Sequence, residues 1–253
     1  MKQIWKQTWR QRLAAALIQL LMVLAMAGVG IRMPVQAAEK NAVTQSGEMK
    51  VHFLDVGQGL SILAQSEGKT MIYDGGDRKT SRFVVSYLKE HGVSKIDYLI
   101  SSHYDADHMT GLIGCLNAFD VKNVISSNYV HTSKLYQSFV KAVKADGLKM
   151  QHPAIGKTYK FGRGSFEILA PKTIEAKGSN NNSVAIKLMN GENSFVFTGD
   201  AEHESEAAMC NSGIDLSCDV LVPGHHGSAT ATSWDFLQKT VPEYAVISCG
   251  PNN

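Results

Sequence analysis

The sequence predicts an α/β domain in which two β-sheets pack face to face and helices cover their outer sides. Segments typical of strands come in adjacent groups separated by single helices, which fits neither a strictly alternating parallel sheet nor an all-β fold. Several polar corners directly follow apolar runs, and α/β folds place their sites at the carboxyl ends of strands. With 253 residues, 44% of them hydrophobic and 19% charged, the chain is long enough for a sizeable core.

The first half of the chain alternates strands with helices. Apolar runs bounded by glycine-containing turns predict strands at 49–56, 60–64, 70–73, 97–101 and 121–125. Apolar residues at helical spacing predict helices at 81–91, 109–118 and 133–145. Gly92 follows the first of these helices, where glycine typically ends a helix.

The second half repeats this rhythm without repeating the sequence. Apolar runs predict strands at 158–161, 165–169, 183–188, 195–198, 219–222 and 244–247. Helices are predicted at 202–210 and 233–239. The grouping of these strands favours two packed sheets over a single one.

Residues 1–38 have the composition of a targeting segment. They carry five basic residues and no acidic one, and an apolar run over 13–31 leads to the small-x-small pattern Val35-Gln36-Ala37. We expect a cleaved secretory signal, with an uncleaved membrane anchor as the alternative because the run is long. Both place the rest of the chain outside the cytoplasmic membrane, with 39–48 as a polar linker and 49–253 as the folded domain.

The charge distribution argues against a general attraction to nucleic acid. The chain has a formal net charge of +2, but without residues 1–38 it has 20 basic and 23 acidic residues, a net charge of −3. Counterion displacement from a phosphate backbone requires a basic surface. We therefore expect no strong basic patch on the domain, and membrane contact only through the N-terminal segment.

The four cysteines do not form a zinc knuckle. Cys115, Cys210, Cys218 and Cys249 contain no C-x-x-C pair. Export permits disulfides, and Cys210 and Cys218 flank a glycine-containing loop. A bridge between these two and free buried thiols remain equal alternatives.

The most informative segment is His103-Tyr104-Asp105-Ala106-Asp107-His108, which follows an apolar strand. Two imidazoles and two carboxylates within one short turn favour metal binding, because neighbouring carboxylates repel one another unless a cation lies between them. The alternative is a polar loop with an incidental histidine pair.

Further polar corners follow other predicted strands. Asp74 ends the strand at 70–73, Asp200 follows Gly199, and His225-His226 follows Gly224. Each corner contains glycine, which lets the backbone turn sharply and approach a ligand. Four such corners in one domain predict that side chains far apart in sequence meet at one sheet edge.

These motifs resemble the metallo-β-lactamase superfamily, whose fold is a four-layer αββα sandwich with a metal site at the edge of its sheets. The H-x-D-x-D-H variant of the family signature is similar to the extracellular domain of ComEC-type competence proteins, which are membrane channels for DNA uptake. Further segments match the same subgroup, namely 53–59, Asp74-Gly75-Gly76, Asn180-Asn181-Asn182-Ser183, 198–202 and Gly224-His225-His226-Gly227-Ser228.

The resemblance implies a site for two cations, Zn²⁺ or Mn²⁺. His103 and Asp105 would bind one ion, Asp107 and His108 the other, and Asp200 would bridge them. His225 would complete one shell. The oxygen-rich donor set suits Mn²⁺ and still accepts Zn²⁺.

The resemblance also implies roles around these ligands. Asp74 would orient the ligand loop, and Asn180 or Asn182 stands where lactamases have another histidine. His226 is either a ligand or a substrate contact, and Ser228 is a candidate substrate contact. Asp107, if loosely bound, would carry a proton to the leaving group.

Two departures from the subgroup pattern bear on these expectations. Leu60 stands where the subgroup has Asp after Gly-Gln-Gly, so no polar role is expected at this position. The family continues with a His-containing loop and a final helix after the strand at 244–247, so we expect the chain to be truncated at its C-terminus relative to the family.

The predicted function is an exported metal-dependent hydrolase that uses a metal-bound hydroxide. The resemblance favours a phosphodiesterase or nuclease, with extracellular DNA as a candidate substrate. An esterase for cell-wall phosphate esters is a second enzyme hypothesis, and a lactamase is a weaker one because the ligand set differs. The alternative from another class is a non-catalytic module that binds extracellular DNA or an envelope polymer.

Overall fold

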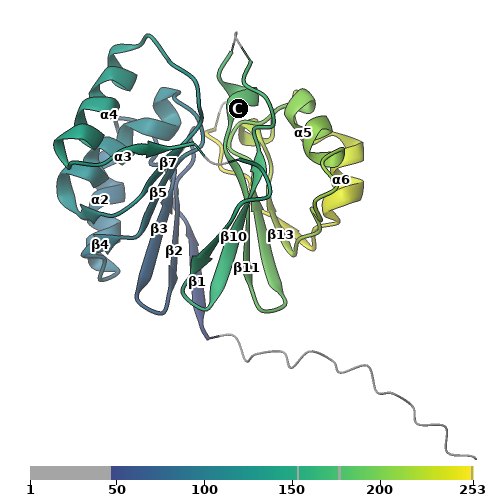
Figure 1. Ribbon diagram of the computed structural model, residues 1–253, viewed down its shortest axis with the longest axis horizontal. Coiled ribbons are helices and arrows are strands. Elements are labelled where there is room, and N and C mark those ends of the chain that lie inside the picture. The colour runs from purple at the N-terminus through teal and green to yellow at the C-terminus, as the bar shows by residue number, and fades with distance from the viewer. Residues whose placement is uncertain (1–46, 153, 176–177, 252) are drawn as a thin grey trace, which may run out of the picture. The chain divides into compact units, whose positions relative to one another are not determined.

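The computed structural model describes residues 47–152, 154–175, 178–251 and 253. The predicted signal or anchor at 1–38 and most of the predicted linker at 39–48 lie outside the described residues. Among the helices that are described, none is both long and apolar enough to cross a bilayer. Figure 1 labels the elements of the fold.

The first six-stranded sheet is built from the N-terminal half of the domain. Its order is β1-β2-β3-β5-β7-β8, and the bounds are β1 Met49–Phe53, β2 Ile62–Ser66, β3 Lys69–Tyr73, β5 Tyr98–Ser101, β7 Val124–Ser126 and β8 Met150–Gln151. The first three strands are antiparallel, and β3, β5, β7 and β8 run parallel. Parallel neighbours bring their carboxyl ends to one edge.

The second six-stranded sheet is built from the C-terminal half. Its order is β14-β13-β12-β11-β10-β9, and the bounds are β9 Thr158–Phe161, β10 Gly164–Ala170, β11 Ala185–Asn190, β12 Asn193–Phe197, β13 Val220–Val222 and β14 Tyr244–Ala245. Strands β9 to β12 are antiparallel, and β12, β13 and β14 are parallel. A separate pair, β4 Lys95–Ile96 and β6 Asp120–Val121, lies next to β3 of the first sheet.

Helices cover the outer face of each sheet. The first sheet is covered by α2 (Ser81–Glu90), α3 (Ala106–Ala118) and α4 (Lys134–Ala145), and the second by α5 (His203–Cys210) and α6 (Trp234–Thr240). Figure 1 shows the two groups of helices on opposite sides of the two sheets. The predicted four-layer α/β sandwich is confirmed.

The period-2 alternation of the strands divides the core into layers. Leu63 and Ile72 face the helices, whereas Ile62 and Met71 face the second sheet. Three buried clusters result: one under α2 to α4, one between the sheets, and one under α5 and α6. This double burial explains why the strands read as nearly continuous apolar runs.

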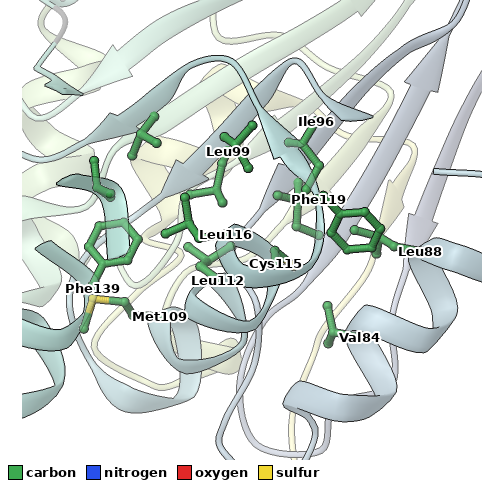
Figure 2. Close-up of a cluster of buried hydrophobic side chains, with 14 of the residues drawn as sticks. Val84, Leu88, Ile96, Leu99, Met109, Leu112, Cys115, Leu116, Phe119 and Phe139 are labelled. Carbon is green, nitrogen blue, oxygen red and sulfur yellow. The ribbon is translucent and has the colours of Figure 1, made fainter. Parts of the chain in front are cut away.

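Figure 2 shows the cluster beneath α3. Leu112 and Leu116 lie near Leu99 on β5, and Met109 of the same helix lies beside Phe139 on α4. Burying five such side chains contributes on the order of 10 kcal/mol before chain entropy is subtracted. The first two turns of α3, which carry Asp107 and His108, are thereby fixed on the sheet.

The structure corrects several predicted boundaries. Helix α3 begins at Ala106 instead of 109, so half of the ligand motif is helical rather than part of a turn. Strand β1 ends at Phe53, and the predicted strand at 121–125 divides into β6 and β7. Strands β4 and β8 and two 3₁₀ turns, η1 (Asn180–Asn182) and η2 (His225–Gly227), were not predicted. All four cysteines are free thiols, so Cys210 and Cys218 are not bridged.

Candidate metal centre

Three imidazoles and a carboxylate converge at the carboxyl ends of β5, β12 and β13. The Nε2 atoms of His103, His108 and His226 lie 3.1–3.7 Å from the carboxylate oxygens of Asp200. The Nε2 atoms of His108 and His226 are 3.2 Å apart, and Asp107 Oδ2 lies 3.3 Å from that of His226. Two overlapping groups of side chains could each hold a metal ion, namely His103–His108–Asp200 and Asp107–His108–His226. Within each group the donor atoms lie within 4.8 Å of one another.

Asp74 and Ser102 fix the two histidines of the ligand loop. Asp74 Oδ2 lies 2.8 Å from His108 Nδ1 and accepts a hydrogen bond from Ser102 Oγ at 2.7 Å. Ser102 Oγ lies 2.9 Å from His103 Nδ1, and since its own proton goes to Asp74 it accepts from that ring. In its neutral form each of these rings therefore carries its proton on Nδ1 and presents a free Nε2 lone pair.

The backbone fixes His226 in the same tautomer. Its Nδ1 lies 2.9 Å from the carbonyl oxygen of Ser248, which can only accept a hydrogen bond. The Nε2 lone pair of His226 thus points to the same centre as those of His103 and His108. A histidine that binds a metal through one ring nitrogen is commonly oriented by a hydrogen bond at the other ring nitrogen. All three imidazoles of this cluster are held in this way.

Two atoms at the centre lack hydrogen-bond partners. Within the part of the chain that the structure describes, His103 Nε2 and Asp200 Oδ1 are buried and accept or donate no hydrogen bond. Asp200 Oδ1 does lie 3.1 Å from His108 Nε2, which carries no proton in the tautomer described above. Buried polar atoms without partners are costly, and a cation would satisfy both. The donor set of imidazole nitrogens and carboxylate oxygens therefore fits a transition metal.

The electrostatics of the cluster also favour a cation. Burial disfavours the charged form of His108, but the carboxylates of Asp200 and Asp74 outweigh burial and raise its pKa well above the ordinary value. Burial opposes ionisation of Asp200, yet the surrounding histidines lower its pKa. A pocket that draws protons onto imidazoles also attracts a metal ion to the same lone pairs.

Two carboxylates of the ligand loop lie at the rim of the cluster. Asp105 Oδ2 is 3.7 Å from His103 Nε2, and its Oδ1 accepts a hydrogen bond from Ser179 Oγ at 2.7 Å. The neighbouring imidazole of His103, with the hydrogen bond from Ser179 in addition, lowers the pKa of Asp105 to about 2. Burial raises the pKa of Asp107, but His226 and His108 more than compensate, so the net shift is downward. Both groups are therefore carboxylates at neutral pH.

Close backbone contacts hold the loops at these distances. A Cβ on Gly111 of α3 would lie 1.8 Å from the carbonyl oxygen of Gly75, so only glycine lets α3 approach the turn after Asp74. Gly75 N donates to the carbonyl oxygen of His108 at 2.6 Å. The backbone of Asp74 itself is left-handed, with φ +58°, a conformation that costs energy and is concentrated at functional sites.

Residues 54–250 match the metallo-beta-lactamase superfamily. This chain belongs to that superfamily. The match covers both sheets apart from β1, and it includes every residue of the cluster, so the resemblance inferred from the motifs is confirmed.

Curated relatives of this chain carry names that refer to competence and recombination. The chain is 29% identical over 227 residues to ComE operon protein 3 of Bacillus subtilis (strain 168), covering 82% of this chain and 29% of that protein. It is 32% identical over 206 residues to Recombination protein 2 of Haemophilus influenzae, covering 79% of this chain and 24% of that protein. The chain thus matches about a quarter of the length of these relatives.

A solved structure supports the assignment of the fold. CmlA, a diiron beta-hydroxylase from Streptomyces venezuelae, matches with a TM-score of 0.53 and 17% identity, covering 79% of this chain and 44% of that one. At this identity the likeness shows the fold of the superfamily alone.

The structure separates the two adjacent histidines of the superfamily's later motif. The predicted ligand His225 is not in the cluster: its Nδ1 lies 3.0 Å from Glu202 Oε1 and 3.0 Å from Thr230 Oγ1. His226 lies in the cluster instead. Both residues have left-handed φ angles, +49° and +55°, so the backbone turns one ring away from the centre and the other toward it.

The other predicted contacts lie around the cluster. Asn182 is buried and holds the preceding loop through Glu175 N, Glu175 O and Gly178 O. Asn180 lies on η1, and Ser228 contacts Thr230 Oγ1 at 3.2 Å.

Leu60 lies in the core rather than at the mouth of the site. Its side chain packs between the two sheets, and its backbone N–H donates to the carbonyl oxygen of Asp107 at 3.2 Å.

Two serines of the site were not predicted. Ser102 Oγ holds His103 directly and donates to Asp74, which holds His108. Ser183 Oγ lies 3.5 Å from His103 Nδ1 and accepts from the N–H of Asp200 at 3.1 Å. Gly199 allows this contact between the sheets, because a Cβ there would lie 2.6 Å from that of Ser102. Ser183 directly follows the Asn-rich motif, but nothing in that motif indicates which atom contacts the imidazole.

Proposed function

We propose that this domain is a metal-dependent phosphodiesterase whose candidate polymeric substrate is extracellular DNA. The observation that carries the proposal is the convergence of three imidazole Nε2 atoms on Asp200, with every Nδ1 held by another group. The superfamily assignment supports hydrolytic chemistry, and the names of the relatives, which refer to competence and recombination, support DNA as the phosphodiester.

The proposed ligands form two sets that share Asp200. His103 and Asp105 lie on one side of it, and Asp107, His108 and His226 lie on the other. The mixture of nitrogen and oxygen donors suits Zn²⁺ or Mn²⁺, and we propose two ions. Such a pair of cations would supply Lewis acidity at phosphoryl oxygens and make a shared water more acidic.

Side chains of this domain bind the substrate and transfer protons during its hydrolysis. Asp107 is a third exposed, and its Oδ2 is 3.3 Å from His226 Nε2, so it faces both the cluster and solvent. We assign to Asp107 Oδ2 the transfer of a proton from the attacking water to the leaving oxygen. The net charge of −3 outside residues 1–38 means that specific contacts, not general attraction, must bind the polymer.

Hydrolysis of bis(4-nitrophenyl) phosphate with Zn²⁺ or Mn²⁺ tests this function. We expect Asp107→Ala to reduce kcat by about 10²- to 10⁴-fold. Asp146→Ala, which alters an exposed carboxylate at the end of α4, is the matched control and should leave the rate unchanged. If the purified protein binds no metal but still shifts DNA in a gel, the non-catalytic binding module is the correct function.

We also propose an extracytoplasmic location, supported by the basic and apolar composition of residues 1–38. Mass spectrometry of the exported protein would test it. A mature chain beginning at 38 or 39 supports a cleaved signal, a full-length chain in the membrane fraction supports an anchor, and cytoplasmic protein contradicts both.

A further inference from the structure

The net charge of −3 outside residues 1–38 conceals two regions of opposite sign. Residues 121–172, which we call the basic region, carry nine basic and two acidic residues, a net charge of +7. Residues 173–253 carry three basic and ten acidic residues, a net charge of −7. Such an asymmetry within one domain indicates a polyanionic partner for its basic part. None of the roles proposed above belongs to a residue of the basic region.

The fold gathers the basic region on one side of the two sheets. The region contains β8 and β9, which are the terminal strands of the first and second sheets. Residues 152–157 connect these two strands directly, so the sheet edges that they form lie on the same side. The exposed lysines of the region include Lys141, Lys144, Lys149, Lys157, Lys160 and Lys172. Within the residues that the structure describes, these six form no ion pair with a carboxylate, so their charge is available to a partner.

Helix α4 presents its lysines on the face opposite the core. Lys134 and Lys141 are seven positions apart and lie on one face, whereas Tyr136 and Phe139 are buried on the other. In the described part of the basic region, Val130 is the single exposed large hydrophobic residue. Binding in a bilayer interface requires an apolar helix face that can enter the lipid, and that face of α4 is already packed. The basic region therefore suits a soluble polyanion better than a membrane.

A groove of about 400 Å³ lies between the C-terminal half of α4 and β8. Its lining combines the apolar residues Val140, Val143, Leu148 and Met150 with Lys144 and Lys149. All the residues that line the groove belong to the described part of the chain, and none of them is Asp or Glu. The groove therefore offers two cationic groups to an anion and no carboxylate that would repel it.

The groove leads to the edge that carries the metal centre. Strand β8 is parallel to β7 and β7 to β5, so their carboxyl ends share the edge of the ligand loop. His152 directly follows β8 and lines the groove, and its Nδ1 lies 3.0 Å from the carbonyl oxygen of Ser126 on β7. The next carbonyl oxygen, that of Ser127, accepts a hydrogen bond from Tyr104 Oη of the ligand loop at 2.6 Å. A polymer lying along β8 therefore reaches the metal centre past His152.

We propose that this groove binds the phosphate backbone of a nucleic acid strand and directs the strand to the metal centre. The inference rests on the proposed function and deepens it, because the bound strand is the polymer whose phosphodiester is hydrolysed. Lysine ammonium groups neutralise phosphates and release condensed counterions, so such binding weakens as the salt concentration rises. Contacts with the backbone carry no base-sequence information, so the groove accepts any sequence.

The salt dependence of DNA binding tests the proposal. Fluorescence anisotropy gives the affinity for a labelled oligothymidine whose phosphorothioate linkages keep the charge and resist hydrolysis. In Lys144→Gln/Lys149→Gln the affinity at about 50 mM NaCl should fall at least about 10-fold, and the salt slope should become shallower by about 1.4, because two phosphate contacts are lost. The control Lys89→Gln/Lys239→Gln, which removes exposed lysines in the last turns of α2 and α6, should match the wild type. Equal affinities and slopes for the two double variants overturn the proposal.

Two further probes identify what the groove binds. An oligothymidine with methylphosphonate linkages has the same bases but an uncharged backbone, and it should bind the wild-type chain at least about 10-fold more weakly at low salt. Equal binding of the charged and uncharged strands overturns the proposal. Vesicles that contain phosphatidylglycerol provide the other probe. If Lys144 and Lys149 are required for binding to these vesicles and not for binding to DNA, the groove is a membrane contact and the proposal is wrong.

Hydrolysis by the wild-type chain separates this inference from the proposed function. If the lysine-dependent binding of DNA is found but neither DNA nor bis(4-nitrophenyl) phosphate is hydrolysed, the groove stands and the phosphodiesterase fails. If the small ester is hydrolysed and Lys144→Gln/Lys149→Gln binds DNA as the wild type does, the phosphodiesterase stands and the groove fails.

Discussion

Asp74 Oδ2 lies 2.8 Å from His108 Nδ1, and both side chains are completely buried. The other carboxylate oxygen, Oδ1, accepts the backbone N–H of Ser102 at 2.8 Å. Asp74 thus connects the end of β3 with the beginning of the ligand loop after β5. A metal ligand held in this way loses little conformational freedom when it binds an ion.

Replacing Asp74 should therefore weaken metal binding without removing a ligand. Asp74→Asn keeps the size and tolerates the left-handed backbone, but it loses the charge that fixes the His108 tautomer. We expect the affinity for Zn²⁺ to fall about 10- to 100-fold, measured by competition with a chromogenic chelator. Asp77→Asn, at a partly exposed position of the following turn, is the control. Equal affinities for wild type and Asp74→Asn would contradict the positioning role.

The two adjacent histidines should differ in metal content. His226→Ala removes an Nε2 atom from the cluster, so we expect the metal bound per chain to fall, as measured by plasma mass spectrometry after dialysis. His225→Ala removes a ring that contacts Glu202 and Thr230, so the bound metal should stay at the wild-type amount. The opposite pattern would show that His225 is the ligand.

The fold was predictable from the sequence because its strands are buried on both faces or end at glycine corners. Runs such as Met71-Ile72-Tyr73 retain their apolar character when one side chain faces a helix and the next faces the other sheet. The start of α3 was less predictable. Asp105 occupies the N-cap position of α3. The sequence alone does not show that a helix follows, so the polar residues after Asp105 resemble a loop.

The sequence indicated several residues of the cluster but not the direction of every side chain. The sequence indicates that His225 and His226 follow a strand, but the direction of each ring depends on two left-handed φ angles that no pattern specifies. Ser102 and Ser183 are ordinary serines until the two sheets meet and place both hydroxyl groups near one imidazole. Contacts between distant segments depend on tertiary packing, which local sequence does not encode.

Removing the metal should destabilise the domain. An ion that binds only the folded state at 100 times its Kd adds about 2.7 kcal/mol to the free energy of unfolding. For a domain of this size that corresponds to a Tm lower by roughly 5–10 °C after chelation, measured by calorimetry. Added Zn²⁺ should restore the Tm of the wild type but not that of Asp200→Asn, which lacks the central charge. Identical Tm values with and without metal would argue against a resident ion.

Asp97 should give the domain a stabilising contact that disappears in acid. Its carboxylate is buried, lies 3.0 Å from the Nζ atoms of both Lys69 and Lys95, and accepts the N–H of Thr70 at 3.1 Å. Burial alone would raise its pKa, but these donors outweigh burial and lower the pKa. Because the pKa is lower in the folded state, the contribution is complete above the unfolded pKa of about 3.9 and is lost as pH falls through the folded value.

Asp97→Asn should therefore lower the free energy of unfolding by about 1–3 kcal/mol at pH 7, measured by urea denaturation. The difference from wild type should stay constant between pH 8 and pH 5 and shrink below about pH 4, where the wild-type carboxylate becomes protonated. Asp120→Asn breaks an exposed pair with Lys122 and should cost at most about 1 kcal/mol. A deficit in Asp97→Asn that persisted unchanged into acid would mean that the carboxyl acts through packing and not through its charge.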